Sequence, residues 1–446
     1  MSLKKKIYDS SPIFLQNILV SIKGYKKFKI RYRNELKNEI IKESQNNSET
    51  LKKLQTQKLK SYLEEAKNNS DYWKDIISQE FIDDFKLENL KTLPIITKND
   101  IIQNKSFFVN KETNSCNNLI LSTSGTSGAG FNFLISKKAV SIGFTLFWQD
   151  CYHQNRFGDK YATFNGNIIV SLKQKNKPFW RFNRAFNQTI FSVFHMNDKN
   201  LLSYYAKLKK GNYMFVNGYP SAIYHLAEFI LNKNLPPLKV KAIYTSSESL
   251  YIWQRITIEK AFSSKIYDLY SNAEQTVLAY QGEDSKYKVS PLFSYVWFKE
   301  TDVMIENEKA YKVIGTNFNN DAMFFINYDT NDLVLLDKKG EIKKVIGRQE
   351  DVIVLVDGTK IGRLDHLFKE AEDVKAAQII QNDYDNIIIR VVLREEVFKS
   401  KEGIIKQIRN RISKEMKISF EIVERIEKNQ NGKYKFVISN LKNKEI

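Results

Sequence analysis

The feature that most limits the fold of this chain is an alternation, between residues 118 and 316, of short β-rich runs with segments of helix length. The runs are NNLIL, NGNIIVSL, YMFVNG, VKAIYTS and SKIYDLY. Runs of this length, rich in β-branched and aromatic residues and separated by helix-length segments, are typical of α/β proteins. We therefore predict the α/β fold class, with layered mixed β-sheets and helices.

The first 90 residues follow a different pattern. Apolar residues recur there at helical spacing, at Leu51, Leu54, Leu59, Tyr62, Leu63 and Ala66. This periodicity predicts an amphipathic helix and a largely helical N-terminal region. In LKTLPIITKNDI, Pro94 ends the preceding element and Thr97 is a candidate cap for the next helix.

A third pattern begins after Gly347. The stretch NDLVLLDKKGEIKKVIG, which leads up to it, predicts an antiparallel hairpin that turns at Lys339 and Gly340. Beyond it follow the strand DVIVLVDG, a helix around RLDHLFKEAE, the strand NIIIRVVLR and an amphipathic helix with Ile404, Ile405, Ile408, Ile412 and Met416 in phase. We place a domain boundary at about residue 346, between an N-terminal domain of residues 1–346 and a small C-terminal domain of residues 347–446.

Length and composition set further limits. A chain of 446 residues is too long for one compact core. It contains no uninterrupted apolar run of the ~18 residues that a membrane span needs, and its start lacks a cleavage site for secretion. Cys116 and Cys151 are the only cysteines, which argues against a disulfide framework and a Cys-rich zinc site. We expect a cytoplasmic protein.

The formal net charge of +19 raises the question of a nucleic-acid partner. Most of the basic residues are scattered lysines, however, so we expect no nucleic-acid binding. The exception is the N-terminal segment, where Lys4, Lys5, Lys6, Lys23, Lys26, Lys27, Lys29, Arg31 and Arg33 flank apolar Ile13, Phe14, Leu15, Ile18, Leu19 and Ile22. This segment is either a solvated helical face or a surface that contacts an anionic membrane or an acidic partner.

The loop LSTSGTSGAGFNF, residues 121–133, is the first candidate site. Backbone amides in a turn rich in Gly and Ser form a concave nest for anions, and the hydroxyls add donors for phosphate oxygens. The loop is not a Walker sequence, because no G-x-x-x-x-G-K run occurs in the chain. A plain turn after a strand is the alternative.

Four other positions carry groups that suit a nucleotide. Glu274 in YDLYSNAEQ follows a strand-like run, where a carboxylate can hold Mg²⁺ on a triphosphate, although a solvated loop glutamate is the alternative. Asp332 in FFINYDTNDLVLL begins a strand, where its carboxylate can accept hydrogen bonds from both ribose hydroxyls. The alternative is that aspartate stands there because it favours a turn. Arg348 lies at the predicted domain boundary, and Lys433 lies in the glycine turn NQNGKYKF.

Taken in order, these motifs closely resemble those of the adenylate-forming superfamily of acyl-CoA synthetases, luciferases and nonribosomal adenylation domains. Within it they are most similar to the phenylacetate-CoA ligase branch and its capsular-polysaccharide, CapK-like relatives. The matching segments are LSTSGTSG (phosphate loop), VNGYPSAIYHLA (acyl pocket), YTSSESL (adenine-flanking strand), YSNAEQ, TNFNNDAMFFINYDTNDL (ribose), GRQEDVIVLVDGTKI (hinge) and NGKYKFVIS (catalytic lysine). The resemblance implies a large adenylation domain followed by a small, mobile α+β domain.

The resemblance also implies a role for each matching residue. ATP would be bound by Thr123, Ser124, Gly125, Thr126, Ser127, Gly128, Ser246, Ser247, Glu248, Tyr270, Asp332 and Arg348. Glu274 would hold Mg²⁺, Lys433 would bridge the carboxylate and the α-phosphate, and the small domain would rotate about Glu350. Lys435 is the alternative catalytic lysine.

The sequence departs from the superfamily pattern at two places. The phosphate loop continues with AGFNF where Pro and Lys are common, so the loop cation is expected from Lys137 or Lys138. Ser271 and Ala273 stand where Gly and Thr are expected after Tyr270.

The implied activity is ATP- and Mg²⁺-dependent conversion of a carboxylic acid to an acyl-adenylate. The acyl group would pass to coenzyme A, or to an amine or hydroxyl of a sugar nucleotide or glycan in surface polysaccharide biosynthesis. An adenylyltransferase is one alternative, and a non-catalytic scaffold of the same fold that docks on a membrane or an acidic partner is another. The four histidines show no metal-binding spacing, and the run FWRFNRAFNQTIFSVF either packs a core or lines an acyl pocket.

Overall fold

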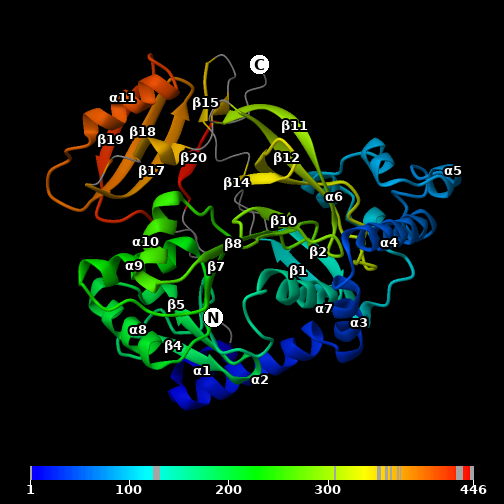
Figure 1. The fold of residues 1–446 in the computed structure, drawn as a ribbon, viewed down its shortest axis with the longest axis horizontal. Coiled ribbons are helices and arrows are strands. Elements are labelled where there is room, and N and C mark those ends of the chain that lie inside the picture. The colour runs from blue at the N-terminus through cyan, green and yellow to red at the C-terminus, as the bar shows by residue number, and fades with distance from the viewer. Residues whose placement is uncertain are drawn as a thin grey trace. The chain divides into compact units, whose positions relative to one another are not determined.

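The computed structural model describes most of the chain (Figure 1). The described residues are 3–123, 131–305, 308–348, 353–356, 360–361, 364–368, 371, 373–427 and 435–441. They form two compact units. The first comprises Met1–Ser247, Ile256–Phe298 and Val313–Thr330, and the second comprises Glu248–Arg255, Lys299–Lys312 and Asn331–Ile446.

The first unit is built on an eight-stranded sheet with the strand order β10-β9-β8-β7-β6-β3-β5-β4. The strands are β3 (Tyr161–Asn165), β4 (Trp180–Asn183), β5 (Gln188–Ser192), β6 (Phe215–Gly218), β7 (Ala242–Ser246), β8 (Ile266–Ser271), β9 (Leu278–Gln281) and β10 (Tyr287–Val289). The central strands β5, β3, β6, β7 and β8 are parallel, and antiparallel strands flank them on both sides. The predicted α/β class is confirmed.

Helices make up the N-terminal region, as its periodicity predicted. They are α1 (Leu3–Ser10), α2 (Ile13–Arg31), α3 (Asn34–Ser44), α4 (Ser48–Asn69), α5 (Gln79–Asp83) and α6 (Lys98–Gln103). Leu59, Leu63 and Ala66 of α4 are fully buried in one core cluster. Thr97 caps α6 in a capping box with Asp100, which satisfies backbone N–H groups at the start of the helix.

The remaining helices of the α/β region follow the strands. They are α7 (Lys137–Leu146), α8 (Asp198–Lys210), α9 (Pro220–Asn232) and α10 (Ile252–Phe262), with a π-helix, η4, at Phe147–Cys151. Short 3-10 helices are η1 (Leu87–Thr92), η2 (Lys105–Phe108), η3 (Ser115–Asn117), η5 (Arg184–Phe186) and η6 (Val193–His195). None of the helices among the described residues combines the length and the apolar character that crossing a membrane requires.

One predicted strand is wrong. The run NGNIIVSL forms no strand beyond Asn165, where β3 ends. Val170 is buried, but Ile168 is 42% exposed and Leu172 is 57% exposed. The carbonyl of Ile169 accepts a hydrogen bond from the Tyr8 hydroxyl at 2.6 Å. A side chain from α1 therefore binds this stretch where a neighbouring strand was expected.

Two further sheets contain the strands before β3 and those from β11 to β16. β1 (Asn118–Thr123) and β2 (Phe131–Ser136) form an antiparallel pair, one on each side of the Ser/Thr/Gly loop. A six-stranded sheet has the order β14-β13-β12-β11-β16-β15. Its strands are β11 (Tyr295–Ile305), β12 (Glu308–Thr316), β13 (Tyr328–Leu336), β14 (Ile342–Arg348), β15 (Ile353–Val354) and β16 (Lys360–Ile361). β13 and β14 are the predicted hairpin, and Gly340 adopts the positive φ of 78° that its turn needs.

The C-terminal part of the second unit has its own core. β17 (Val374–Asp383), β18 (Asn386–Leu393), β19 (Lys417–Ile422) and β20 (Val437–Ser439) form a four-stranded sheet in the order β19-β18-β17-β20. Helix α11 (Lys401–Arg411) contributes Ile404 and Ile408 to its core, as their phase predicted. Only the 3-10 helix η7 (Leu364–Phe368) is described where a helix was expected around RLDHLFKEAE. The domain boundary at residue 346 stays a prediction.

Candidate active site

The carboxyl ends of the parallel strands meet at one edge of the eight-stranded sheet. Gly218 at the end of β6 pairs with Thr245, and Ser246 at the end of β7 pairs with Leu269 of β8. In open α/β sheets, ligands bind beyond the carboxyl ends of the strands. The predicted site residues Ser246 and Tyr270 lie at this edge, and Glu274 follows it.

The end of β7 has an unusual backbone. Ser246 is partly buried, and Ser247, which is exposed, has a left-handed φ of 70°. Non-glycine residues seldom adopt this conformation and concentrate at functional sites when they do. Glu248, the next predicted residue, is partly buried and belongs to the second unit.

Tyr270 is held inside the first unit. Its side chain is 8% exposed, and its hydroxyl lies 3.4 Å from the Thr330 Oγ1. Thr330 in turn donates to the Val313 carbonyl at 3.0 Å. The ring that the resemblance assigns to adenine packing is therefore fixed by its own hydrogen-bond chain.

Glu274 is a buried carboxylate, with 7% of its surface exposed. Its Oε1 accepts a hydrogen bond from the Tyr328 hydroxyl at 2.9 Å, and its backbone carbonyl accepts one from Asn317 Nδ2 at 3.0 Å. Burying a carboxylate is costly unless hydrogen bonds stabilise it, and these two contacts also fix its position. The sequence identified Glu274 but neither Tyr328 nor Asn317, because both act over a long sequence separation.

The chemistry of this site fits Mg²⁺ bound together with a nucleotide. Among the described residues, no group of three or more His, Cys, Asp or Glu side chains is arranged to hold a metal by itself. Mg²⁺ commonly uses one or two carboxylates and takes its other ligands from substrate phosphates and water. The single carboxylate of Glu274 matches that requirement.

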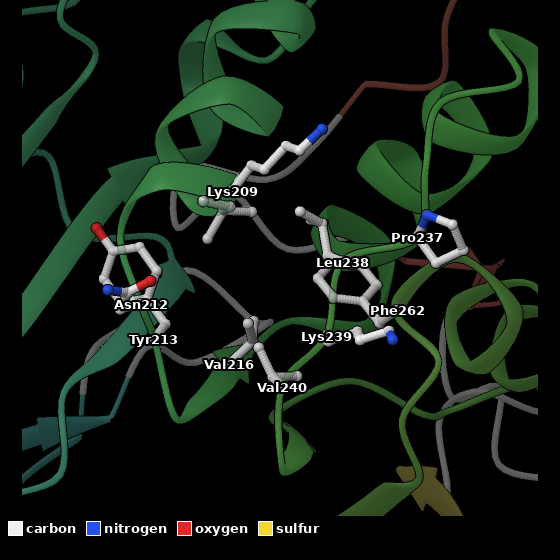
Figure 2. A pocket seen from close by; sticks show the side chains of 10 residues that line it. Lys209, Asn212, Tyr213, Val216, Pro237, Leu238, Lys239, Val240 and Phe262 are labelled. Atoms are coloured by element: carbon white, nitrogen blue, oxygen red, sulfur yellow. The ribbon is translucent and has the colours of Figure 1, made fainter.

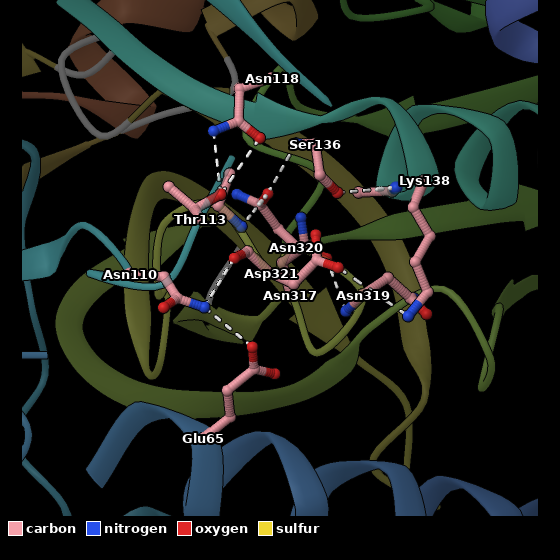
Figure 3. Close-up of polar contacts among 12 residues, drawn as sticks. Glu65, Asn110, Thr113, Asn118, Ser136, Lys138, Asn317, Asn319, Asn320 and Asp321 are labelled. Carbon is pink, nitrogen blue, oxygen red and sulfur yellow. Dashed lines mark hydrogen bonds and ion pairs between the residues drawn. The ribbon is translucent and has the colours of Figure 1, made fainter. Parts of the chain in front are cut away.

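Three asparagines order the loop between β12 and β13, on which part of the site depends (Figure 3). Asn317 binds the Glu274 carbonyl, and Asn319 Nδ2 donates to the carbonyls of Leu292 and Phe293 at 3.0 and 2.9 Å. Asn320 is fully buried. Its Oδ1 accepts from the backbone N–H of Ser136 at 3.0 Å, and its Nδ2 donates to the Leu134 carbonyl at 3.0 Å. One loop thus binds both the Glu274 backbone and the strand that returns from the Ser/Thr/Gly loop.

Both lysines expected as the loop cation have protein partners. Lys137 Nζ donates to the Cys116 carbonyl at 2.7 Å. Lys138 Nζ lies 3.9 Å from Asp321 Oδ2, in a pair exposed enough to contribute little stability (Figure 3). These contacts leave the choice between Lys137 and Lys138 a prediction.

Several predicted residues fall outside the described part of the chain. They are Ser124, Gly125, Thr126, Ser127, Gly128, the hinge residue Glu350 and the lysine Lys433. Thr123 is the last residue of β1. Lys435 is described, and its carbonyl accepts a hydrogen bond from Gln378 Nε2 at 2.8 Å.

The second unit contains the predicted ribose pair. Asp332 of β13 is 7% exposed, and its Cα lies directly opposite that of Arg348 on the antiparallel strand β14. Asn331 before it has a φ of 59°, and Gly347 beside Arg348 has a φ of 108°. The backbone therefore brings together two residues that are sixteen positions apart in the sequence, as a ribose-binding pair would require.

A cavity of about 200 Å³ lies elsewhere in the first unit (Figure 2). Its lining includes Tyr213 and Val216 at the start of β6 and Val240 just before β7. These residues mark the amino ends of the strands, opposite to the edge where ligands bind in such sheets. We therefore do not assign the cavity to the candidate active site.

The π-helix η4 carries a partly buried acid that the sequence did not single out. Asp150 Oδ2 accepts a hydrogen bond from Ser290 Oγ at 2.5 Å. Burial raises the pKa of this carboxyl to about 6, against the smaller lowering effect of Ser290. π-Helical turns are often found at functional sites. Nothing in FWQDCYH distinguished this aspartate from a solvated one.

His195 and part of the aromatic run pack the interior. His195 is 8% exposed, stacks on Phe179 and pairs with Ser192 Oγ at 2.8 Å. Phe179 and Phe191 of the aromatic run are also buried. Of the two roles open to this run, these residues match core packing.

The fold is similar to those of several solved enzymes. It matches a solved 2-hydroxyisobutyryl-CoA ligase in the postadenylation state in complex with R3-HIB-AMP, with a TM-score of 0.65 and 15% identity over 89% of this chain and 91% of that one. It also matches the amide bond synthetase McbA from Marinactinospora thermotolerans, with a TM-score of 0.52 and 13% identity over 72% of this chain and 68% of that one. At these identities the likeness is one of fold, and the fold is that of adenylate-forming ligases.

In sequence, the chain is a homologue of CapK. Residues 353–440 match the CapK C-terminal domain. Protein CapK from Staphylococcus aureus is 29% identical over 457 residues, which cover 98% of this chain and 99% of that protein. The resemblance inferred from the ordered motifs is thereby confirmed.

Proposed function

We propose that this protein is an ATP-dependent adenylate-forming ligase that activates a carboxylic acid and transfers its acyl group to an acceptor. The observation that carries the proposal is the buried Glu274 carboxylate next to the carboxyl edge of the sheet, positioned by Tyr328 and Asn317. The fold, shared with ligases solved with acyl-adenylates, supports it.

The first step would join the acid to AMP. A carboxylate oxygen attacks the α-phosphorus of ATP, a new P–O bond forms, and the bond to the β-phosphate breaks with release of pyrophosphate. Bound Mg²⁺ would neutralise phosphate charge, and Glu274 is the residue that would hold it. Tyr270 would pack near adenine, flanked by Ser246, Ser247 and Glu248, while Asp332 and Arg348 would bind ribose.

The other ATP contacts rest on the motif resemblance. Thr123, Ser124, Gly125, Thr126, Ser127 and Gly128 would bind the β- and γ-phosphates. Lys433 would bridge the acid and the α-phosphate, and the small domain would rotate about Glu350 between the two half-reactions. The dependence on ATP implies a cytoplasmic reaction.

The second step would transfer the acyl group. A nucleophile attacks the acyl carbon, and AMP leaves with the electron pair of the broken C–O bond. One structural neighbour is named a CoA ligase solved with CoA, and another is named an amide bond synthetase, so this fold serves both thiol and amine acceptors. Because the chain is a CapK homologue, we propose an amine or hydroxyl of a sugar nucleotide or glycan in surface polysaccharide biosynthesis, with CoA as the alternative.

The test is pyrophosphate release from ATP and Mg²⁺, with hydroxylamine as the trapping nucleophile, across aryl, fatty, hydroxy and amino acids. We expect release that depends on one class of acid and falls sharply in Lys433→Ala, while Lys435→Ala keeps it. A stable AMP-modified product without any acyl hydroxamate would favour an adenylyltransferase. Failure to bind ATP with Mg²⁺ would favour the non-catalytic scaffold.

A further inference from the structure

The N-terminal part of the surface helix α2, from Ile13 to Tyr25, is oriented in an unusual way: Gln16, Asn17 and Ser21 face the protein, and several large apolar side chains face outward. Phe14, Ile18, Ile22 and Tyr25 are spaced for one face of the helix. They are 68%, 48%, 49% and 48% exposed, and Leu19 beside them is 36% exposed. A helix that served only to cover the sheet would bury such a stripe.

Contacts with the edge strand β4 fix this orientation. Asn17 Oδ1 accepts from the backbone N–H of Phe182 at 2.9 Å, and Ser21 Oγ accepts from that of Arg184 at 3.0 Å. Gln16 Oε1 accepts from the fully buried Arg181 at 2.7 Å. These side chains satisfy donors that an edge strand otherwise exposes.

A glycine sets how closely helix and strand approach. A Cβ at Gly24 would lie 2.2 Å from Asn183 Oδ1, so a larger residue at this point of α2 would require the Asn183 side chain to move. The helix can therefore neither roll to bury its apolar stripe nor move away from β4 without breaking several hydrogen bonds. In Figure 1, α2 and β4 lie together at the lower edge of the view.

The charge around the stripe indicates what covers it. From residue 10 to residue 34 the chain has six basic residues, at Lys23, Lys26, Lys27, Lys29, Arg31 and Arg33, and no acidic one. Lys23, Lys26 and Lys29 are exposed. Burial, and to a smaller extent the neighbouring cations Arg31 and Lys23, lower the pKa of Lys27.

A groove of about 310 Å³ adjoins the stripe at Ile13. Trp180 and Phe182 of β4 supply apolar walls, and Lys160 and Lys207 add two more cations. Both lysines therefore extend the cationic surface beyond α2 itself, while the aromatic rings extend its apolar part.

We propose that α2 docks the protein on an anionic lipid surface. The stripe of Phe14, Ile18, Ile22 and Tyr25 enters the boundary between headgroups and acyl chains, and the lysines bind the lipid phosphates. A second copy of this chain fits the surface less well, because pairing two such helices would bring like charges together. This inference does not depend on the proposed ligase activity.

The first experiment is sedimentation of the full-length protein with vesicles, in the absence of ATP. The vesicles contain phosphatidylcholine with phosphatidylglycerol, or phosphatidylcholine alone. We expect binding to the anionic vesicles that weakens as salt is added, because salt screens the lysines. No binding to anionic vesicles at low salt would overturn the proposal.

Two variants separate the apolar and the charged contributions. Phe14→Ser/Ile18→Ser/Ile22→Ser is expected to lose binding at every salt concentration. Lys23→Gln/Lys26→Gln is expected to weaken binding about fivefold for each lysine replaced. The matched controls are Leu202→Ser/Ile256→Ser, at side chains 56% and 61% exposed, and Lys338→Gln/Lys339→Gln in an exposed hairpin turn, all of which should bind as the native protein does.

Two further readouts keep the test decisive. The thermal unfolding midpoints of the apolar variant and its control should agree, because every replaced side chain is exposed. Sedimentation velocity gives the oligomeric state in solution. If the native protein is a dimer and the apolar variant is a monomer, the stripe is a contact between copies and the lipid proposal is wrong.

Discussion

Two buried glutamates in the first unit have similar immediate surroundings and very different settings. Glu274 accepts from the Tyr328 hydroxyl at 2.9 Å, and Glu228 accepts from the Tyr224 hydroxyl at 3.0 Å. They are 7% and 6% exposed. Tyr224 and Glu228 are one turn apart on α9, whereas Tyr328 and Glu274 come from segments 54 positions apart.

The difference shows that a buried carboxylate does not by itself mark a site. The Glu228 pair holds one helical turn together. The Glu274 pair fixes a loop next to the carboxyl edge of the sheet, where Gln275 adopts a positive φ of 56° and Asn317 holds the Glu274 carbonyl. Segments that are distant in the sequence thus combine to position the Glu274 carboxylate. We propose that this arrangement serves function.

We expect the largest difference between the two glutamates when the charge of each is removed. Glu274→Gln keeps the size and one acceptor but removes the charge proposed to hold Mg²⁺. We expect acid-dependent pyrophosphate release to fall by about 10²-fold or more. Glu228→Gln, the matched control, should stay within about twofold of the native rate. Equal losses in the two variants would mean that Glu274 has a structural role only.

Asp150 extends the comparison to a third carboxyl, one that is partly buried with a serine donor. Because its pKa in the folded protein is about 6, above that of the unfolded chain, the folded state binds the proton more tightly. Stability therefore falls as the pH rises from about 4 to about 6, by up to about 3 kcal/mol. Asp150→Asn should remove this loss, as measured by urea unfolding at pH 4 and pH 7.

Asp71 serves as a control because its pKa is shifted in the opposite direction to that of Asp150. The Lys111 ammonium, which hydrogen-bonds this exposed carboxylate, lowers its pKa below the usual range. Asp71 thus contributes stability above the pKa of the unfolded chain and loses it as the pH falls. Asp71→Asn should flatten the unfolding curve at the acidic end, and a shift in the same direction as Asp150→Asn would contradict this account.

The asparagine loop tests whether the Glu274 region depends on long-range hydrogen bonds. Asn320→Ala would leave the Ser136 N–H and the Leu134 and Met323 carbonyls without this partner in a buried place. We expect a loss of about 2–3 kcal/mol in the free energy of unfolding. Asn382→Ala, at an exposed asparagine, should change it by less than about 0.5 kcal/mol.

The sequence predicted elements better than it predicted the contacts between them. The parallel strands YMFVNG, VKAIYTS and SKIYDLY and the hairpin at Gly340 formed as expected, because local propensity and turn chemistry determine them. The strand predicted for NGNIIVSL was wrong, because the hydroxyl of Tyr8, 161 positions away in the sequence, binds its backbone instead.

The same limit applies to the site. Motif order singled out Glu274, Tyr270 and the opposed pair Asp332 and Arg348, which stay predicted site residues. Tyr328 and Asn320 were missed, since a tyrosine or an asparagine near a strand has no local signature of the partner it will meet. For α2, the apolar spacing was visible in the sequence, but the side of the helix that faces β4 depends on Asn17, Ser21 and Gly24, whose partners lie far along the chain.

The smallest expected difference between Glu274 and Glu228 concerns the tyrosines that donate hydrogen bonds to them. Tyr328→Phe and Tyr224→Phe each remove one hydroxyl from a buried carboxylate, so we expect each to lower the free energy of unfolding by about 1–2 kcal/mol. Only Tyr328→Phe should also slow pyrophosphate release, by about tenfold, because it alone releases a carboxylate proposed to touch the Mg²⁺ complex. Added Mg²⁺ should restore part of that rate, since the weakened site is refilled by mass action. If Tyr328→Phe lowers stability but leaves both the rate of pyrophosphate release and its Mg²⁺ dependence unchanged, then the hydrogen bond from Tyr328 to Glu274 has a structural role only, like that from Tyr224 to Glu228.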